Sequence, residues 1–406
     1  MEEGSKCSKC GKAIPAGEGH CPWCEDRSGS PLPRRETVVT LSLVGLGILF
    51  VATGFTVRFY HAMERSLAVD WYRTGESSLR QGAPARAVDD LRNALFYSRD
   101  NSLYRLRLSQ ALIAARRPEE AEAHLLNLWE RQPGDGTVNL ELARLAAGSN
   151  DISKAARFYH NAIYGVWPEQ PEAHRRQVRF EYCELLLAHQ RNAEAQAAIL
   201  ELATQLPRDP VLISRVGTLF LRAEDYSRAF SQFQQALRID SRIEEALQGA
   251  GLAAFQLGNY RDARRYLEWA VKVKPDDTPS AELLEMTQMI LSIDPIESAL
   301  PAAERARRVV RAFEQARKRL ELCAQQRGET LEAPNPETEL QDVSARLAKV
   351  RPKVRERYLE RNPDLVNDVT QLVFLTENVA TRQCGPAKGL DQAILLVARK
   401  YAGGEQ

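Results

Sequence analysis

The segment ALQGAGLAAFQLGNYRDARRYLEWAVKVKP, residues 246–275, contains the pattern that decides the fold. Apolar and small residues recur at helical spacing on both sides of Gly258 and Asn259, which predicts two helices joined by a short turn. Ala263 lies where the second helix meets the first, and Pro275 follows the second helix as an exit signal. The segment therefore predicts a pair of closely packed antiparallel helices.

The same pattern recurs along most of the chain. Six alanines occupy the equivalent position at spacings of 34, 34, 40, 34 and 34 residues. They are Ala87, Ala121, Ala155, Ala195, Ala229 and Ala263. A small residue is needed there because a larger side chain would force the paired helices apart. Self-similarity at this period indicates an array of stacked helix pairs.

This pattern resembles the tetratricopeptide repeat (TPR) family. The fifth repeat carries its small and aromatic positions at Gly217, Tyr226, Ala229, Phe233 and Ala236, and Trp71 and Gly75 open the series. The resemblance covers about residues 68–277, as six repeats. It implies an all-α superhelix whose first helices line a concave surface that binds extended or helical segments of other proteins.

Two details of the array are predicted from the same alignment. The one irregular spacing falls on residues 167–172, WPEQPE, which we interpret as a lengthened turn that tilts the two halves of the array. Cys183 occupies the close-packed position of the fourth repeat and is interpreted as a core residue.

The concave surface of the first four repeats is predicted to be mainly apolar, with Arg144 near its middle. The predicted groove residues are Tyr72, Leu106, Gln110, Ile113, Leu140, Arg144, Phe180, Glu184 and Leu187. The same rows continue into the last two repeats as Ser214, Thr218, Leu221, Gln248, Leu252 and Phe255. Because the lysines and asparagines of the family's carboxylate-clamp members are missing, an amphipathic partner segment is favoured over an acidic tail. The alternative is that several apolar residues pack against neighbouring helices, since an error of one residue rotates a helix by about 100°.

An uncharged segment, TVVTLSLVGLGILFVATGFTV, occupies residues 37–57. About 20 apolar residues in a helix span a bilayer core of roughly 30 Å, so this segment predicts one transmembrane helix. A buried core helix and a cleaved signal peptide are the alternatives, but a signal segment would lie nearer the start of the chain.

Charges flanking this segment predict its orientation. Basic residues precede it at Lys6, Lys9, Lys12, Arg27, Arg34 and Arg35, whereas Arg58, Arg65 and Arg73 follow it. The excess predicts a cytoplasmic N-terminus. A reducing compartment also preserves clustered thiols, so the repeats are expected outside the cytoplasm.

Two CxxC pairs lie near the N-terminus, Cys7 with Cys10 and Cys21 with Cys24. Four thiolates in two such turns complete a tetrahedral shell around a metal ion, and Zn²⁺ is the expected cofactor. The segment, about residues 1–30, resembles the small zinc-ribbon family, although Glu25 stands where glycine is usual. A structural metal site is favoured over a redox pair, because a thioredoxin-type CxxC needs a βαβ context that is missing here.

Residues 278–406 continue with helical periodicity after the repeat fades. We expect the first of these helices, near residues 281–293, to cap the array and the rest to form a separate helical hairpin or partner-facing module. The segment around residues 305–319 is basic, which fits a solvated face or, alternatively, contact with anionic lipid. Cys323 and Cys384 lie near predicted helix ends and form a candidate disulfide, with two unrelated buried thiols as the alternative.

Composition narrows the class of function. The formal charge of +1 over 406 residues gives no field that would recruit nucleic acid, so none is expected as a partner. No nucleophile elbow, phosphate loop or dinucleotide-binding motif is found, so a non-enzymatic scaffold for protein partners is predicted. Two alternatives remain: a regulator of cell-envelope assembly resembling bacterial membrane-anchored TPR proteins with a rubredoxin-like module, and an extracytoplasmic thiol-redox or cytochrome-maturation helper.

Overall fold

The structure is a computed structural model that describes residues 5–24, 34–297, 300–332 and 336–402. These residues form eighteen α-helices and no β-strand, so the predicted all-α repeat array is confirmed. The chain forms two compact units, Met1–Pro133 and Gly134–Gln406.

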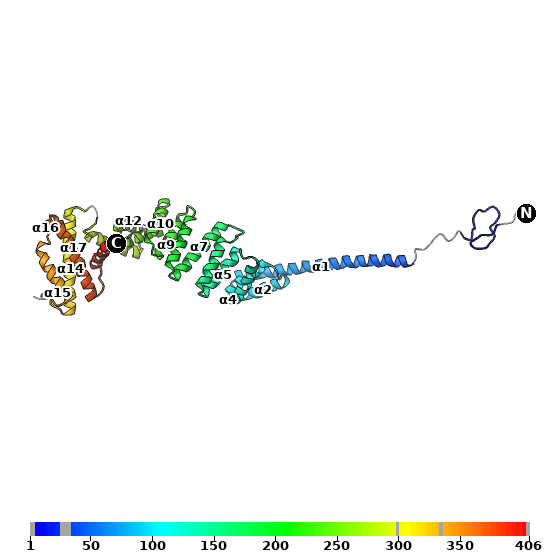
Figure 1. Ribbon diagram of the computed structural model, residues 1–406, viewed down its shortest axis with the longest axis horizontal. Helices are drawn as coiled ribbons and strands as arrows, with labels where there is room; N and C mark the ends of the chain where they lie inside the picture. Colours follow the sequence, from blue (N-terminus) through cyan, green and yellow to red (C-terminus); the bar gives the residue numbers. More distant parts are fainter. Residues whose placement is uncertain (1–4, 25–33, 298–299, 333–335, 403–406) are drawn as a thin grey trace. The chain divides into compact units, whose positions relative to one another are not determined.

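The first unit contains the cysteine segment and two helix pairs. Figure 1 shows α1 as one uninterrupted helix, whose apolar first part continues into the first helix of the first repeat. The second pair follows after a short turn. The helices are α1 (Arg34–Arg80), α2 (Pro84–Tyr97), α3 (Ser102–Ala114) and α4 (Pro118–Arg131).

The second unit begins with four helix pairs, each an antiparallel hairpin of the predicted kind. They are α5 (Gly136–Gly148) with α6 (Ile152–Tyr164), α7 (Pro171–Ala188) with α8 (Asn192–Thr204), α9 (Pro210–Arg222) with α10 (Tyr226–Ile239), and α11 (Glu244–Gln256) with α12 (Tyr260–Val273). Asp135, Asp151, Asp209 and Asp225 cap helix N-termini by accepting hydrogen bonds from backbone N–H groups.

Small residues set the spacing within each pair. All six periodic alanines are fully buried. A Cβ added to Gly217 on α9 would lie 2.7 Å from the ring of Phe233, and one added to Gly249 on α11 would lie 2.2 Å from it. One aromatic ring of α10 therefore packs against the backbones of two successive first helices, which only glycine allows.

The turn inside every pair contains one residue in the left-handed conformation, always five positions before the periodic alanine. Glycine occupies this position in the first and last pairs. The residues are Gly82, Arg116, Asn150, Gln190, Glu224 and Gly258. The four non-glycine residues adopt a strained backbone because the packing of the two helices requires it.

The six-residue insertion before α7 folds back onto the start of α5. Trp167 is buried, donates its indole N–H to the carbonyl of Ala162 at 2.9 Å and stacks on His174 at 4.7 Å between ring centroids. A Cβ on Gly136 would lie 2.3 Å from the Trp167 ring. The insertion is thus a packed element that fills the space beside α5.

The chain beyond the repeats forms further helices that share one hydrophobic core with the last repeat. They are α13 (Thr278–Ile293), α14 (Ala302–Arg327), α15 (Glu339–Val350), the short 3₁₀-helix η2 (Arg351–Lys353), α16 (Glu356–Glu360), α17 (Pro363–Cys384) and α18 (Leu390–Ala402). Tyr260 of α12, Ile290 of α13, Phe313 of α14, Val373 of α17 and Ile394 of α18 all belong to this core. α18 returns to pack on α13, so the helices after the repeats share this core and do not stand apart as a hairpin, while a partner-facing role for them stays a prediction.

Candidate functional site

Four cysteine sulfurs converge within residues 5–24. Gly11 adopts a φ of +71°, and its N–H donates to the carbonyl of Cys7 at 2.9 Å, which closes the first turn. All four Sγ atoms lie within 4.8 Å of one another. Cys7 and Cys24 are 3.8 Å apart, and Cys10 and Cys21 are 3.5 Å apart.

This spacing fits a metal ion. Bonds of about 2.3 Å in a tetrahedral S₄ shell place the sulfurs about 3.8 Å from one another. Hydrogen bonds from the backbone N–H groups of Lys9 and Cys10 lower the pKa of Cys7 to about 6. Burial raises the pKa of Cys21. The four cysteines can therefore hold a metal ion, with Cys7 the readiest to supply a thiolate.

Among the described residues, one helix is long and apolar enough to cross a membrane. This is α1, whose best 18-residue window has a mean hydropathy of 2.2 and no buried part. The apolar side chains, such as Phe50 and Phe55, are exposed. The segment is thus not a core helix of this chain.

In the first unit, the predicted groove residues lie on α1 and α3 and are half-buried. Tyr72 stacks on Tyr104 with ring centroids 4.7 Å apart. Gln110 accepts a hydrogen bond from Arg107 at 2.8 Å. Leu106 and Ile113 are half-buried, so all four side chains retain only part of their surface.

In the second unit, the apolar groove residues are buried within the repeats. The exposed fractions of Leu140, Phe180 and Leu187 are 6%, 2% and 9%. The guanidinium of Arg215 lies 4.0 Å from the centroid of the Phe180 ring and covers it. These three apolar side chains therefore contribute to the core and not to an open groove.

The charged groove residues of this unit are joined in ion pairs between successive first helices. Arg144 of α5 donates from two nitrogens to the carboxylate of Glu181 on α7, at 3.0 and 2.7 Å. Glu184 of α7 pairs with Arg222 of α9. On the surface of α5, α7 and α9, here called the paired surface, these charges neutralise one another beside apolar residues that are already buried.

A cavity of about 850 Å³ opens farther along the array, between α9, α11, α13 and α18. We call it the concave cavity. Its apolar lining consists of Leu221, Leu252, Phe255, Leu283, Met286 and Leu396. Its carboxylates are Glu245, Asp277 and Glu282, and Thr218 and Gln248 also line it. Five of the six residues predicted for these rows thus face this space, whereas Ser214 is buried.

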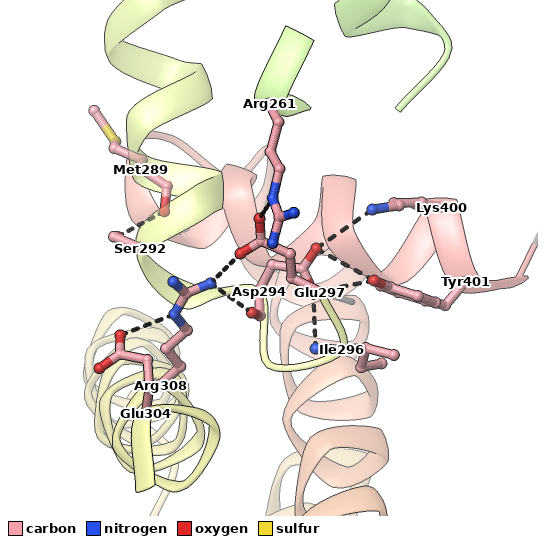
Figure 2. Close-up of polar contacts among 10 residues, drawn as sticks. All are labelled: Arg261, Met289, Ser292, Asp294, Ile296, Glu297, Glu304, Arg308, Lys400 and Tyr401. Atoms are coloured by element: carbon pink, nitrogen blue, oxygen red, sulfur yellow. Dashed lines mark hydrogen bonds and ion pairs between the residues drawn. The ribbon is translucent and has the colours of Figure 1, made fainter. Parts of the chain in front are cut away.

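Polar contacts of Asp294 hold α18 in place beside the concave cavity. Figure 2 shows that Asp294, in the loop after α13, faces Lys400 and Tyr401 of α18. Its carboxylate accepts a hydrogen bond from the Tyr401 hydroxyl at 3.2 Å and lies 3.5 Å from the Lys400 Nζ. Asp294 is almost fully buried, so removing either partner leaves a charge poorly compensated.

Glu297 joins the last repeat to α14 in the same loop. Its carboxylate accepts a hydrogen bond from Arg308 of α14 at 2.7 Å and pairs with Arg261 of α12 (Figure 2). Burial alone would raise the pKa of Glu297, but hydrogen bonds from Arg308 and Arg261 outweigh burial and lower this pKa. The two acidic residues of this loop therefore connect α12, α14 and α18.

A buried ionic cluster fixes the other end of α18. Arg319 of α14 lies 3.1 Å from the carboxylate of Glu377 on α17 and 3.2 Å from that of Asp391 on α18. Gln315 donates to Asp391 at 2.7 Å. Glu377 is fully buried, and this burial, together with the nearby Asp391 charge, raises the pKa of Glu377 to about 8. One arginine thus contacts two carboxyl groups, and the raised pKa shifts Glu377 toward its protonated form.

The structure brings Cys323 and Cys384 together as a disulfide bond, with Cα atoms 5.7 Å apart and a sequence separation of 61. Cys323 lies one helical turn after Arg319, whose guanidinium also donates to the carbonyl of Gly385 at 3.1 Å. Cys183 is buried and unbridged in the core of the fourth repeat.

Sequence reasoning missed the contribution of α13 and α18 to the concave cavity. Glu282, Leu283 and Met286 lie on α13, and Leu396 lies on α18. Apolar residues recur three and four positions apart in LDQAILLVARKYA, residues 390–402, and this helical spacing could have revealed α18. The packing of α18 against α13 could not have been predicted from this spacing, because the contact joins segments about 100 residues apart in sequence.

Comparison with known proteins agrees with this architecture. The tetratricopeptide repeat family matches residues 78–137 and residues 249–282. The chain therefore contains tetratricopeptide repeats, as the resemblance predicted.

Individual relatives are distant. Tetratricopeptide repeat protein 13 of Homo sapiens is 26% identical over 181 residues, which are 44% of this chain and 20% of that protein. The chain thus spans a fifth of the length of this curated relative. Among solved structures, YrrB, a TPR protein with an unusual peptide-binding site, has a TM-score of 0.38 and 14% identity, covering 47% of this chain and 96% of its own. PilF of Pseudomonas aeruginosa has a TM-score of 0.38 and 13% identity, covering 54% of this chain and 97% of its own.

Proposed function

We propose that the chain is a membrane-anchored scaffold that holds a segment of a partner protein in the concave cavity. The observation that supports this most is the cavity itself, since about 850 Å³ lined by apolar side chains and a few polar groups is typical of a binding site. TPR repeats generally bind protein or peptide partners, and their proteins are typically non-enzymatic. We propose no reaction for this chain.

Site-specific photocrosslinking in cells tests the docking site. A photoreactive amino acid is placed at Leu252 in the cavity or at Leu200 on α8, which is exposed outside it. We expect one defined product from position 252 that is missing from position 200 and is lost when Leu283 is changed to Asp. Equal products from both positions, or none from position 252, would contradict the proposal.

We further propose that the four N-terminal cysteines bind one Zn²⁺ ion, since thiolates in a tetrahedral shell favour zinc. Elemental analysis of the full chain, purified under reducing conditions, should find one zinc per chain. Cys10→Ser combined with Cys21→Ser should remove the zinc and leave the helical circular dichroism signal unchanged. A wild-type chain without stoichiometric metal would rule this out.

We also propose that α1 spans the membrane with the cysteine segment in the cytoplasm and the repeats outside. The basic residues before the span and the need of the four thiols for a reducing compartment support this orientation. The bridged pair Cys323 and Cys384 is consistent with an oxidising compartment for the C-terminal helices.

Thiol labelling tests the orientation. Ala193→Cys introduces an exposed thiol at the start of α8, in a chain whose Cys183 is buried. A membrane-impermeant maleimide should label this thiol in intact cells, and should reach the N-terminal cysteines only after permeabilisation and metal removal. Labelling in the opposite order would reverse the proposed topology.

A further inference from the structure

We infer that the concave cavity takes a cationic amphipathic segment, in which apolar side chains alternate with or flank lysine or arginine. This inference rests on the proposed function and specifies its partner. It comes from the charges that line the cavity, from its apolar floor and from the wall that α18 supplies.

The charges of the cavity are of one sign. Its titratable lining residues are Glu245, Asp277 and Glu282, and no lysine or arginine lines it among the described residues. Asp277 accepts a hydrogen bond from Gln248 at 2.7 Å. Glu245 and Glu282 are exposed, and within the described part of the chain the nearby Lys274 pairs with Glu244 and not with either of them. Two carboxylates at the cavity are therefore free to bind cations.

The floor between these carboxylates is apolar and only partly covered. Leu252 is 37% exposed, and Phe255, Leu283 and Met286 are half-buried. Leucine and phenylalanine bind aliphatic side chains by burial of apolar surface, and methionine adapts its shape to the occupant. Lysine and arginine suit this combination, because their hydrocarbon stems lie on apolar surface while their charged groups reach the rim.

The wall formed by α18 makes the site depend on the C-terminal helices. Leu396 and Gln392 of α18 line the cavity together with residues of α11 and α13. The contacts of Asp294 with Lys400 and Tyr401 hold this helix at one end, and those of Asp391 with Gln315 and Arg319 hold it at the other. A pair of TPR repeats without this helix would present an open surface in place of a cavity.

The same charges exclude an acidic partner. A segment rich in aspartate or glutamate would face two unpaired carboxylates, and like charges across an interface are unfavourable. The paired surface, in contrast, offers no free charge of either sign at its ion pairs, so it provides no competing site for a cationic segment.

Binding of defined peptides to the full chain in phosphatidylcholine nanodiscs tests the inference. The probe is a fluorescein-labelled peptide of leucine and lysine, about 14 residues long, and its counterpart has glutamate in place of lysine. We expect the leucine–lysine peptide to bind above the level of empty nanodiscs, and more weakly as salt rises, because ions screen exposed charges. The leucine–glutamate peptide should not bind.

Variants locate the binding. Glu245→Gln combined with Glu282→Gln should weaken binding of the leucine–lysine peptide by about tenfold or more, since both partner charges are lost. Glu285→Gln, an exposed glutamate of α13 outside the cavity lining, is the matched control and should leave the affinity unchanged. Circular dichroism of each variant verifies the fold.

The outcomes separate this inference from the proposed function. If the photocrosslink at position 252 captures a segment without excess lysine or arginine, the scaffold proposal stands and the cationic partner is rejected. If the double variant binds the peptide as tightly as the wild type, or if the leucine–glutamate peptide binds equally well, the inference is also rejected. Failure of both the peptide and the crosslink would reject the cavity as a docking site.

Discussion

The molecule has two surfaces built from the first helices of its repeats: the paired surface of α5, α7 and α9, and the concave cavity of α9, α11, α13 and α18. They differ in whether their charged groups and apolar side chains are free to contact a partner. On the paired surface Arg144 binds Glu181 and Glu184 binds Arg222, while Arg215 covers the ring of Phe180. In the concave cavity Glu245 and Glu282 face solvent beside an apolar floor.

The repeat fold by itself therefore does not determine where a groove is open. Every first helix presents equivalent positions, but the surface is closed where charges match between neighbouring repeats and the apolar side chains beside them, such as Phe180 and Leu187, are buried. Where the neighbours are α13 and α18, no cation among the lining residues complements the carboxylates, and the surface stays available to a partner.

The largest expected effect comes from removing the ring that spaces the helices of the cavity. Phe233→Ala should lower the free energy of unfolding by about 3–5 kcal/mol, because it empties a fully buried site against Gly217 and Gly249. Urea unfolding of the full chain, followed by tryptophan fluorescence, measures the loss, and binding of the leucine–lysine peptide should disappear. Phe96→Ala, whose side chain is 65% exposed, is the control and should change stability by less than about 0.5 kcal/mol. Equal effects of the two variants would contradict the assigned packing.

Breaking the disulfide tests how strongly it stabilises the C-terminal helices that wall the cavity. Cys323→Ser combined with Cys384→Ser should destabilise these helices by about 4 kcal/mol, because the bond closes a loop with a sequence separation of 61 residues in the unfolded chain. Thermal unfolding measures the loss. Reducing agent should reproduce it in the wild type and have no further effect on the variant. A wild type that does not respond to reduction would contradict a bridged pair.

The proton held by Glu377 makes the attachment of α18 depend on pH. Its pKa of about 8 in the folded chain exceeds the ordinary value of 4.5, so the folded state keeps a proton that the unfolded state has released. Stability should therefore fall as pH rises between about 4.5 and about 8, by on the order of a few kcal/mol. Glu377→Gln should flatten this dependence, measured as urea midpoints of wild type and variant across that range. Parallel curves for the two proteins would show that Glu377 does not carry the effect.

The smallest effect should come from breaking the ion pair between Arg144 and Glu181 on the paired surface. Arg144→Ala removes an exposed ion pair, and such pairs contribute less than about 1 kcal/mol. Glu181→Ala and the double variant complete a cycle that measures the coupling of the two side chains. Because Phe180 and Leu187 remain buried, binding of the leucine–lysine peptide should stay within about twofold of the wild type. A gain in peptide binding after Arg144→Ala would show that ion pairing alone keeps this surface closed.

Local periodicity made much of this architecture predictable. The six alanines, the glycines beside them and the CxxC pairs are defined by spacing within one repeat or one short segment. They can therefore be recognised without knowledge of the fold. The apolar segment of α1 is likewise a property of composition. The array and its repeats are confirmed, whereas zinc binding, the membrane orientation and the docking site remain proposals.

The period, the close-packed positions and the candidate metal ligands can be read from spacing along the chain, because they depend on neighbours in sequence. Which groove residues are open depends on the packing of the helices, since a rotation of about 100° per residue moves a side chain such as Phe180 from the surface to the core. The packing also decided that Arg116 and Glu224 adopt the left-handed conformation, because two packed helices override the local preference of a non-glycine residue. Finally, tertiary contacts place α18 as a wall of the concave cavity. The contacts of α18 with α13 and α14 join residues far apart in sequence, and no local pattern encodes them.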